Sequence, residues 1–150
     1  MKRIVIYIAL LAASILLPSR GMDVGKLKPV GLVQLYKEGG TVFILTDTGD
    51  SGEGETVEAA FENLEKTTSG VIFLDTADYL LISKSAMYEI ETIKQYLKPA
   101  IDVCVANQGI DLVKAAEYLA VHHPRVELKD KNVLKAAQTL VMENNRLILK

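Results

Sequence analysis

Strand-like and helix-like patterns alternate along this chain of 150 residues. Two runs of strand-forming residues, Leu32–Tyr36 and Thr41–Thr46, flank a Gly-Gly pair and predict a β-hairpin. The next segment, 47–55, holds three glycines and no large apolar side chain, so we expect an exposed loop. From Thr56 to Thr68, apolar residues recur at helical spacing beside outward-facing glutamates. This pattern predicts an amphipathic helix with Thr56 as its N-cap.

The middle of the chain contains two continuous apolar runs. Val71–Leu74 is typical of a strand that is covered on both faces, and Tyr79–Ile82 predicts a second strand. A helix is expected to begin at Ser83 or Ser85 and to end at Leu97, because a proline follows two residues later.

The C-terminal third predicts one more strand and two more helices. Ile101–Ala106 has the composition of a strand, and a turn then leads to a helix from Asp111 through His122. A last helix is expected to open at Asp130 or Asn132 and to be broken by Asn144-Asn145. The last five residues are then expected to form a short, strand-like tail.

The order of these elements, ββ-α-β(β)-α-β-α-α, predicts the fold class. Strands that alternate with helices after a hairpin indicate a mixed α/β fold, in which helices cover a mixed sheet. We expect residues 1–20 to be a signal peptide or membrane anchor, 21–31 to be a tether, and 32–150 to be a single α/β domain. The chain length suits one such domain.

The formal net charge of -2 is the sum of a basic start and an acidic remainder. Residues 1–20 carry Lys2, Arg3 and Arg20 and no acid, whereas the remainder holds fourteen basic residues and all 19 acidic ones and therefore carries −5. Fourteen uncharged residues, Ile4–Leu17, follow the first two cations. A basic start, a short apolar core and a proline after it are the layout of an export signal.

The length of this apolar run separates a signal from a membrane span. Fourteen helical residues reach about 21 Å, which is short of the ~30 Å hydrocarbon core of a bilayer. We therefore favour a signal sequence, with an uncleaved anchor as the alternative. The expected location is the extracytoplasmic face of the cell or spore membrane, or the medium after secretion.

Composition excludes several classes of protein. With 49% hydrophobic and 24% charged residues, the chain is not intrinsically disordered. Its single cysteine excludes an intramolecular disulfide and a cysteine-clustered zinc site. The near-neutral charge argues against nucleic acid as a partner. Cys104 lies in a strand-like run, so we expect it to be a small buried hydrophobic residue.

One triplet suggests a reaction. Asp47-Thr48-Gly49 follows an apolar strand, as in aspartic proteases, where two carboxylates share one proton. Asp50 would add a charge to such a site, and Asp75-Thr76-Ala77 lacks the glycine of a second triplet. We therefore expect a solvated loop. A small secreted hydrolase that uses Asp47 or Asp75 is the alternative.

Acidic and imidazole groups are the candidate metal ligands of this chain. Seven acids without an intervening base make up an acidic segment: Asp47, Asp50, Glu53, Glu55, Glu58, Glu62 and Glu65. The EF-hand pattern is absent, so an extracytoplasmic cation-binding domain is only an alternative. His122-His123 is expected to cap a helix. We predict no catalytic, cofactor-binding or metal-binding residue, no cofactor and no enzyme activity.

The segment from Gly52 to Leu119 resembles a known family. The residues Gly52-Glu53-Gly54-Glu55-Thr56, Glu58-Ala59-Ala60 and Asn63-Leu64 are similar to the G-x-T-x-x-E-A-x-x-N-L element of the spore germination receptor C-subunit family (Ger(x)C-like). Tyr79-Leu80-Leu81-Ile82-Ser83 with Ala86 matches a later element of that family, and the following helix, strand and small-residue turn keep the family's order.

This resemblance implies an exported, membrane-associated, non-catalytic protein of an endospore-forming bacterium. The chain departs from the family because it lacks the lipobox cysteine and an early glycine-containing signature. It is also shorter than the family's members. The expectation is an N-terminal domain of this type that acts as a binding or assembly module with a protein partner, attached to the membrane through its N-terminal segment.

Overall fold

The computed structural model describes residues 24–150, so the expected leader at 1–20 lies outside the described residues. The strands of the described part are β1 (Leu27–Pro29), β2 (Leu32–Glu38), β3 (Thr41–Thr46), β4 (Ser51–Gly54), β5 (Val71–Phe73), β6 (Tyr79–Ile82), β7 (Asp102–Ala106), β8 (Gln138–Glu143) and β9 (Arg146–Leu149). The α-helices are α2 (Val57–Thr67), α3 (Ile90–Ile93), α4 (Leu112–His122) and α5 (Val133–Ala136). Short 3-10 helices are η1 (Val24–Lys26), η2 (Leu74–Thr76) and η3 (Lys84–Glu89).

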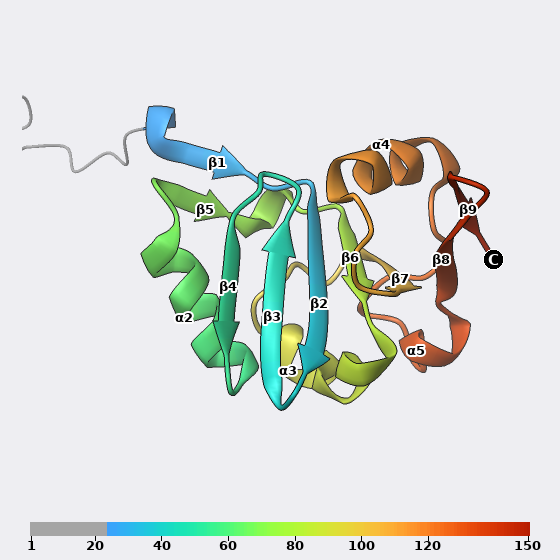
Figure 1. The fold of residues 1–150 in the computed structure, drawn as a ribbon, viewed down its shortest axis with the longest axis horizontal. Helices are drawn as coiled ribbons and strands as arrows, with labels where there is room; N and C mark the ends of the chain where they lie inside the picture. The colour runs from blue at the N-terminus through green and yellow to red at the C-terminus, as the bar shows by residue number, and fades with distance from the viewer. Residues whose placement is uncertain (1–23) are drawn as a thin grey trace, which may run out of the picture.

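Seven strands form one mixed sheet in the order β4-β3-β2-β6-β7-β8-β9. The central strands β2, β6, β7 and β8 are parallel, whereas β3 and β4 on one side and β9 on the other are added by antiparallel pairing. The left half in Figure 1 is therefore a meander, and the right half is built by parallel crossovers to β8, with β9 added at the edge by a hairpin. This arrangement confirms the predicted mixed α/β class.

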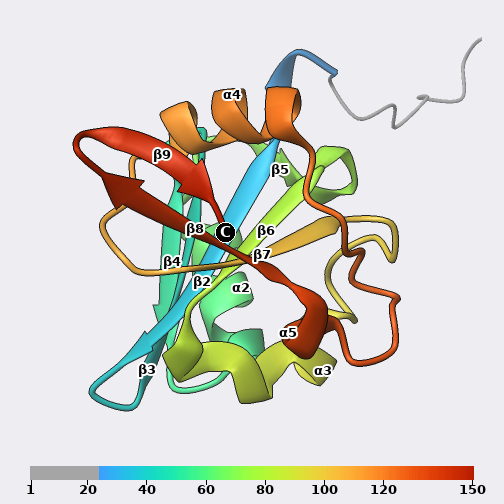
Figure 2. The ribbon, with the colours of Figure 1, turned by 90° about the vertical axis from the view of Figure 1, so that its right-hand side faces the viewer.

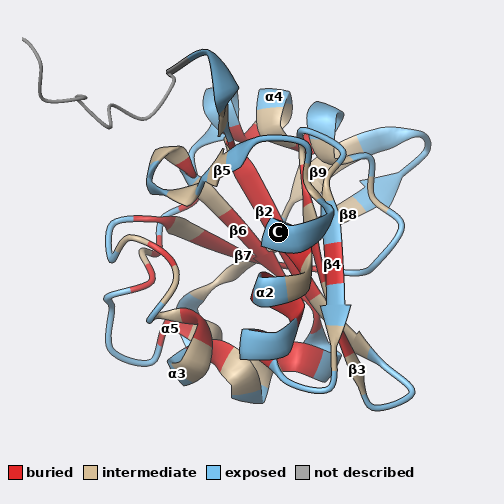
Figure 3. Ribbon diagram, turned by 90° about the vertical axis from the view of Figure 1, so that its left-hand side faces the viewer, coloured by how far each residue is buried: buried red, intermediate tan, exposed pale blue. Residues whose placement is uncertain are grey.

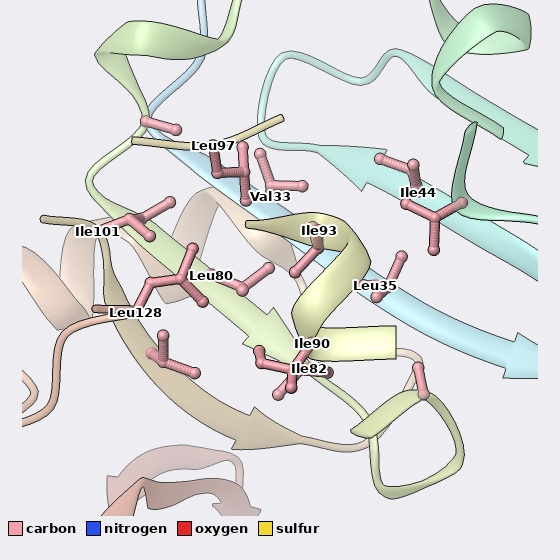
Figure 4. Close-up of a cluster of buried hydrophobic side chains, with 14 of the residues drawn as sticks. Val33, Leu35, Ile44, Leu80, Ile82, Ile90, Ile93, Leu97, Ile101 and Leu128 are labelled. Atoms are coloured by element: carbon pink, nitrogen blue, oxygen red, sulfur yellow. The ribbon is translucent and has the colours of Figure 1, made fainter. Parts of the chain in front are cut away.

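Helices cover both faces of the sheet (Figure 2). Helices α2, α3 and α5 lie on one face, and α4 lies on the other. The larger core lies under α2 and α3 and includes Val33, Leu35, Ile44, Leu80 and Ile82 from the strands (Figure 4). The central strands are the most continuously buried part of the molecule (Figure 3), as expected of a parallel sheet covered on both sides.

The predicted hairpin and the first predicted helix are confirmed. Strands β2 and β3 are joined through Gly39 and Gly40, whose φ angles of 56° and 91° favour glycine. Helix α2 begins after Thr56, whose side chain accepts a hydrogen bond from the backbone N–H of Ala59. Helix α4 begins in the same way, since Asp111 accepts from the N–H of Lys114.

The exposed loop predicted at 47–55 is wrong in its second half, because Ser51–Gly54 is the edge strand β4. Its two glycines let the strand run directly beneath α2. A Cβ at Gly54 would come within 2.6 Å of the backbone nitrogen of Ala60, and one at Gly52 would overlap the carbonyl oxygen of Ala60. The pattern of small residues that suggested a loop is therefore a requirement of strand–helix contact.

Helix α2 also closes the open edge of β4. The Oδ1 atom of Asn63 accepts a hydrogen bond from the N–H of Glu53 at 3.2 Å, and the hydroxyl of Thr67 donates to the carbonyl of Ser51 at 3.1 Å. These two backbone groups point away from β3, where another strand could otherwise pair with them. The helix thus protects the edge while it packs on the strand.

The long C-terminal helix predicted from Asp130 or Asn132 is also wrong. Only Val133–Ala136 is helical, and the chain continues as β8, which pairs with β7 and buries Leu140. Asn144 and Asn145 have φ angles of 49° and 62°, so the expected helix break is instead a two-residue hairpin turn between β8 and β9. Pairing with a strand far away in sequence outweighs the local helical spacing here.

Three further predictions change in detail. The run Val71–Leu74 is not a strand covered on both faces, because β5 pairs only with β1 and leaves Val71 44% and Phe73 39% exposed. Strand β1 itself lies within the segment expected to be a tether, 21–31. The helix expected up to Leu97 is divided into η3 and the single turn α3.

Substitution of Gly52 by alanine tests the contact between β4 and α2. The added methyl group meets backbone that cannot rotate away, so Gly52→Ala is expected to lower the free energy of unfolding by about 1–3 kcal/mol. Urea denaturation measures the change. Ser51→Ala, on the exposed neighbouring residue, is the control and should stay within about 0.5 kcal/mol. Equal stability of the two variants would contradict the proposed contact.

Candidate functional site

The carboxylate of Asp47 has a structural role. Both of its oxygens accept from the backbone N–H of Gly31, at 3.1 and 3.2 Å, and this contact ties the turn after β3 to the start of β2. Asp75 lies exposed in η2 and makes no hydrogen bond to Asp47. The carboxylate pair that an aspartic hydrolase requires is therefore not formed by these two residues.

Asp50, the next acid in this turn, joins the turn to β1. The ammonium of Lys28 lies 3.1 Å from Asp50 Oδ1, and the hydroxyl of Thr48 donates to Oδ2 at 2.8 Å. Burial alone would raise the pKa of the Asp50 carboxyl, but the hydrogen bonds from Thr48 and Lys28 outweigh it and lower the pKa. The ion pair of Asp50 with Lys28 thus links β1 to the seven-stranded sheet.

The remaining acids of the acidic segment do not converge. Glu53, Glu55, Glu58 and Glu65 are exposed, and Glu62 pairs with Lys66 one helical turn away. Within residues 24–150, no group of three or more His, Cys, Asp or Glu side chains is arranged to hold a metal ion. The geometry therefore does not favour the cation-binding alternative.

Cys104 is buried, and His122 and His123 make contacts within and at the end of α4. Cys104 is 1% exposed, and burial raises the pKa of its thiol to about 12, so the thiolate is strongly disfavoured. The prediction that it is a buried hydrophobic residue is confirmed. The rings of His122 and Tyr118 have centroids 4.2 Å apart and planes tilted by 31°. The backbone N–H of His123 donates to the carbonyl of Leu119 at the end of α4.

One titratable group was not singled out by its sequence context. Asp102 lies half-buried at the start of β7, where burial and the nearby Glu127 raise the pKa of its carboxyl, while His123 opposes them. It follows directly on an apolar residue, and its neighbours come from distant segments. No local pattern could have identified it.

A polar crevice lies at the opposite end of the sheet, where β2 and β6 end. It has a volume of about 370 Å³ and is lined by Lys37, Glu38, Ser83, Lys84, Ser85, Asn107 and Gln108. These residues come from the end of β2, from the segment between β6 and η3, and from the loop after β7. The chain leaves β2 toward β3 and leaves β6 toward β7, which lie on opposite sides.

Hydrogen bonds hold the walls of this crevice in place. Gln34, only 2% exposed, donates from its side-chain amide to the backbone carbonyl of Asn107 at 3.1 Å. The N–H of Lys37 donates to Ser85 Oγ at 3.2 Å, and the hydroxyls of Ser83 and Ser85 lie 2.8 Å apart. Residues separated by up to 73 positions in sequence are thereby fixed around one space.

Lys37 has defined partners beside the crevice. Its ammonium lies over the ring of Tyr88, 5.0 Å from the centroid, and 3.3 Å from Glu89 Oε1. Hydrogen bonding to Tyr88 and then to Glu89 raises the pKa of the Lys37 ammonium, against a smaller effect of burial. The charge of Lys37 is therefore already partnered, whereas Lys84 forms no ion pair with any described residue.

The sequence offered one signal for this crevice. Ser83 and Ser85 were identified as possible helix starts, which is the usual role of serine before a helix. Ser83 does precede η3, but its side chain makes no capping hydrogen bond and is directed to Ser85. The sequence shows a serine before the helix, but only the structure shows that its side chain does not cap that helix.

The ion pair of Asp50 with Lys28 should make the stability of the protein depend on pH. A carboxyl whose pKa is lowered on folding stabilises the protein above its unfolded pKa of about 3.9, and this contribution is lost as pH falls through the lower folded pKa. Asp50→Asn should therefore be less stable than the parent at neutral pH, with the difference shrinking below about pH 4. Denaturation at several pH values measures this. Asp75→Asn, at an exposed carboxylate, should show no such convergence.

The burial of Cys104 predicts an unreactive thiol. At pH 8, a thiol-specific disulfide reagent should leave the folded protein unmodified and react fully once guanidinium unfolds the chain. Ser85→Cys provides an exposed comparison that should react in the folded state. Rapid modification of Cys104 in the folded parent would show that this part of the sheet opens.

Comparison with known proteins adds no assignment. No family model, no curated protein and no solved structure matches this chain.

Proposed function

We propose that this protein is a non-catalytic binding or assembly module, exported and held at the extracytoplasmic face of a membrane or secreted. The observation that carries this proposal is the contrast between two sets of polar groups. The residues that suggested chemistry, Asp47, Asp50 and Cys104, have structural contacts or are buried. At the crevice between β2 and β6, in contrast, the exposed side chains of Lys84, Asn107 and Gln108 make no hydrogen bond or ion pair with other residues of the described range 24–150.

The leader supports export. It carries the basic start and the apolar run of an export signal. The segment after it, residues 27–30, is held to the rest of the fold by side-chain contacts. Lys28 of β1 pairs with Asp50, and the hydroxyl of Thr76 binds both the N–H and the carbonyl of Val30. Among the helices of residues 24–150, none is long and apolar enough to cross a membrane. Attachment to a membrane would therefore run through the leader.

The resemblance to the spore germination receptor C-subunit family supports a role in spore germination. The residues that carry it have a common task in this fold. Gly52 and Gly54 permit contact with α2, Thr56 caps that helix, and Asn63 satisfies the strand edge. A motif of this kind specifies packing between β4 and α2, which agrees with the non-catalytic character of the proposed module.

The leader gives the test of location. In an endospore-forming host, cell fractionation and mass spectrometry of the N-terminus should find the protein in the membrane or exported fraction. Leu10→Arg places a charge in the apolar run, at a cost of about 2.5–3.5 kcal/mol for membrane insertion, and should retain the protein in the cytosol.

The control for this experiment is Lys66→Gln, on the exposed face of α2, which should not change the location. An intact parent protein that is found only in the cytosol, with its leader uncleaved, would contradict the proposal.

A further inference from the structure

Strands β1 and β5 carry an apolar patch on their outer face. They pair in parallel, so Leu27 lies beside Val71, and Pro29 lies beside Phe73. Successive side chains of a strand point to opposite faces of a sheet, which places these four residues on one face. Val71 is 44% and Phe73 39% exposed, and Pro29 is exposed as well. These four residues, the β1–β5 patch, are thus only partly covered by the described part of the chain.

The face that carries the β1–β5 patch consists of apolar side chains alone. Ile72 points to the other face, where it packs against the larger core, and Lys28 extends from the same side toward Asp50. Single exposed apolar residues are common on protein surfaces, whereas a contiguous group of them marks an interaction surface. The other large apolar residues exposed within 24–150 belong to η3, α4 and β8 and are Tyr88, Val113, Val121 and Met142.

The position of the patch in the chain places it close to the leader. Leu27 follows Leu17, the last residue of the apolar run, by ten positions. An extended chain advances by at most about 3.6 Å per residue, so these two residues lie within about 36 Å of each other. Strands β1 and β5 lie together at one end of the domain (Figure 1). A leader held in a membrane therefore keeps this end of the domain near the lipid surface.

From this arrangement we infer that the β1–β5 patch contacts the lipid surface beside the leader, as a second and apolar attachment of the domain to the membrane. The transfer of apolar side chains such as Val71 and Phe73 out of water is favourable. Attachment through the leader raises the effective concentration of lipid at the patch, so a contact too weak to hold a free protein is sufficient here.

This inference rests on the proposed function, in which the leader holds the chain at a membrane, and it adds an orientation. Strand β2 begins two residues after β1 and ends at the crevice lined by Lys37 and Glu38. With the β1–β5 patch on the lipid, β2 leads away from the bilayer. The crevice then lies at the end of the domain that is remote from the membrane.

Tryptophan fluorescence tests the inference, because the chain contains no tryptophan. Phe73→Trp introduces one indole into the patch. Tyr88→Trp is the control, at a 66% exposed residue beside Lys37 near the other end of β2. The full chain is reconstituted into phosphatidylcholine vesicles with and without bromine on the acyl chains. The emission of Phe73→Trp should shift to shorter wavelength and lose intensity in the brominated lipid, whereas that of Tyr88→Trp should do neither.

A charge placed in the patch provides the second variant. Val71→Asp, added to Phe73→Trp, should restore the intensity in brominated lipid, because a carboxylate resists transfer into hydrocarbon. Sedimentation with the vesicles should persist through the leader. Ser69→Asp, at an exposed residue before β5, adds the same charge outside the patch and should leave the quenching unchanged.

Several results would overturn the inference while leaving attachment by the leader intact. They are sedimentation of the chain without quenching of the patch indole, equal quenching at both indole positions, and quenching that survives Val71→Asp. A shift of emission without quenching also overturns it, because protein rather than lipid then covers the patch. Failure of the full chain to sediment with vesicles would contradict both the inference and the attachment by the leader, so the two failures are distinguishable.

Discussion

The parallel pairing of β2 with β6 is the contact on which the rest of the architecture depends. It joins Leu32–Leu35 to Tyr79–Ile82 in register, although more than forty residues separate the two strands in the chain. Local antiparallel pairing builds the sheet on one side of this line, and crossover connections build it on the other. The crevice lies where β2 ends in its hairpin with β3 and β6 leads into η3.

Much of the fold followed from local pattern, and the exceptions have a common cause. The hairpin around Gly39-Gly40, the helix capped by Thr56 and the strand Tyr79–Ile82 each combine a clear period with clear end signals. Strand β4 lacks apolar residues because α2 lies against its glycines. Strand β8 has helical spacing but is held by β7. In both cases the deciding partner lies outside the segment.

The candidate site was less accessible to sequence reasoning than the fold. Its walls are joined by Gln34 and Asn107, whose contact spans 73 positions, and a buried glutamine in a strand carries no sign of its partner. The acids that did attract attention were conspicuous for their density between Asp47 and Glu65. The sequence shows how many acids lie close together along the chain, but a binding site requires side chains that point toward one another in space. Most of these side chains point into solvent.

The pairing of β1 with β5 has a mechanical consequence. The two strands run parallel, and β1 leads into β2 after only two residues. If the leader is held in a membrane, tension along the chain would load β1 in shear, so that its hydrogen bonds and the Lys28–Asp50 ion pair resist together instead of opening one after another. The pair of β1 and β5, with three residue pairs against six between β2 and β3, is the part of the fold that such tension would reach before β2.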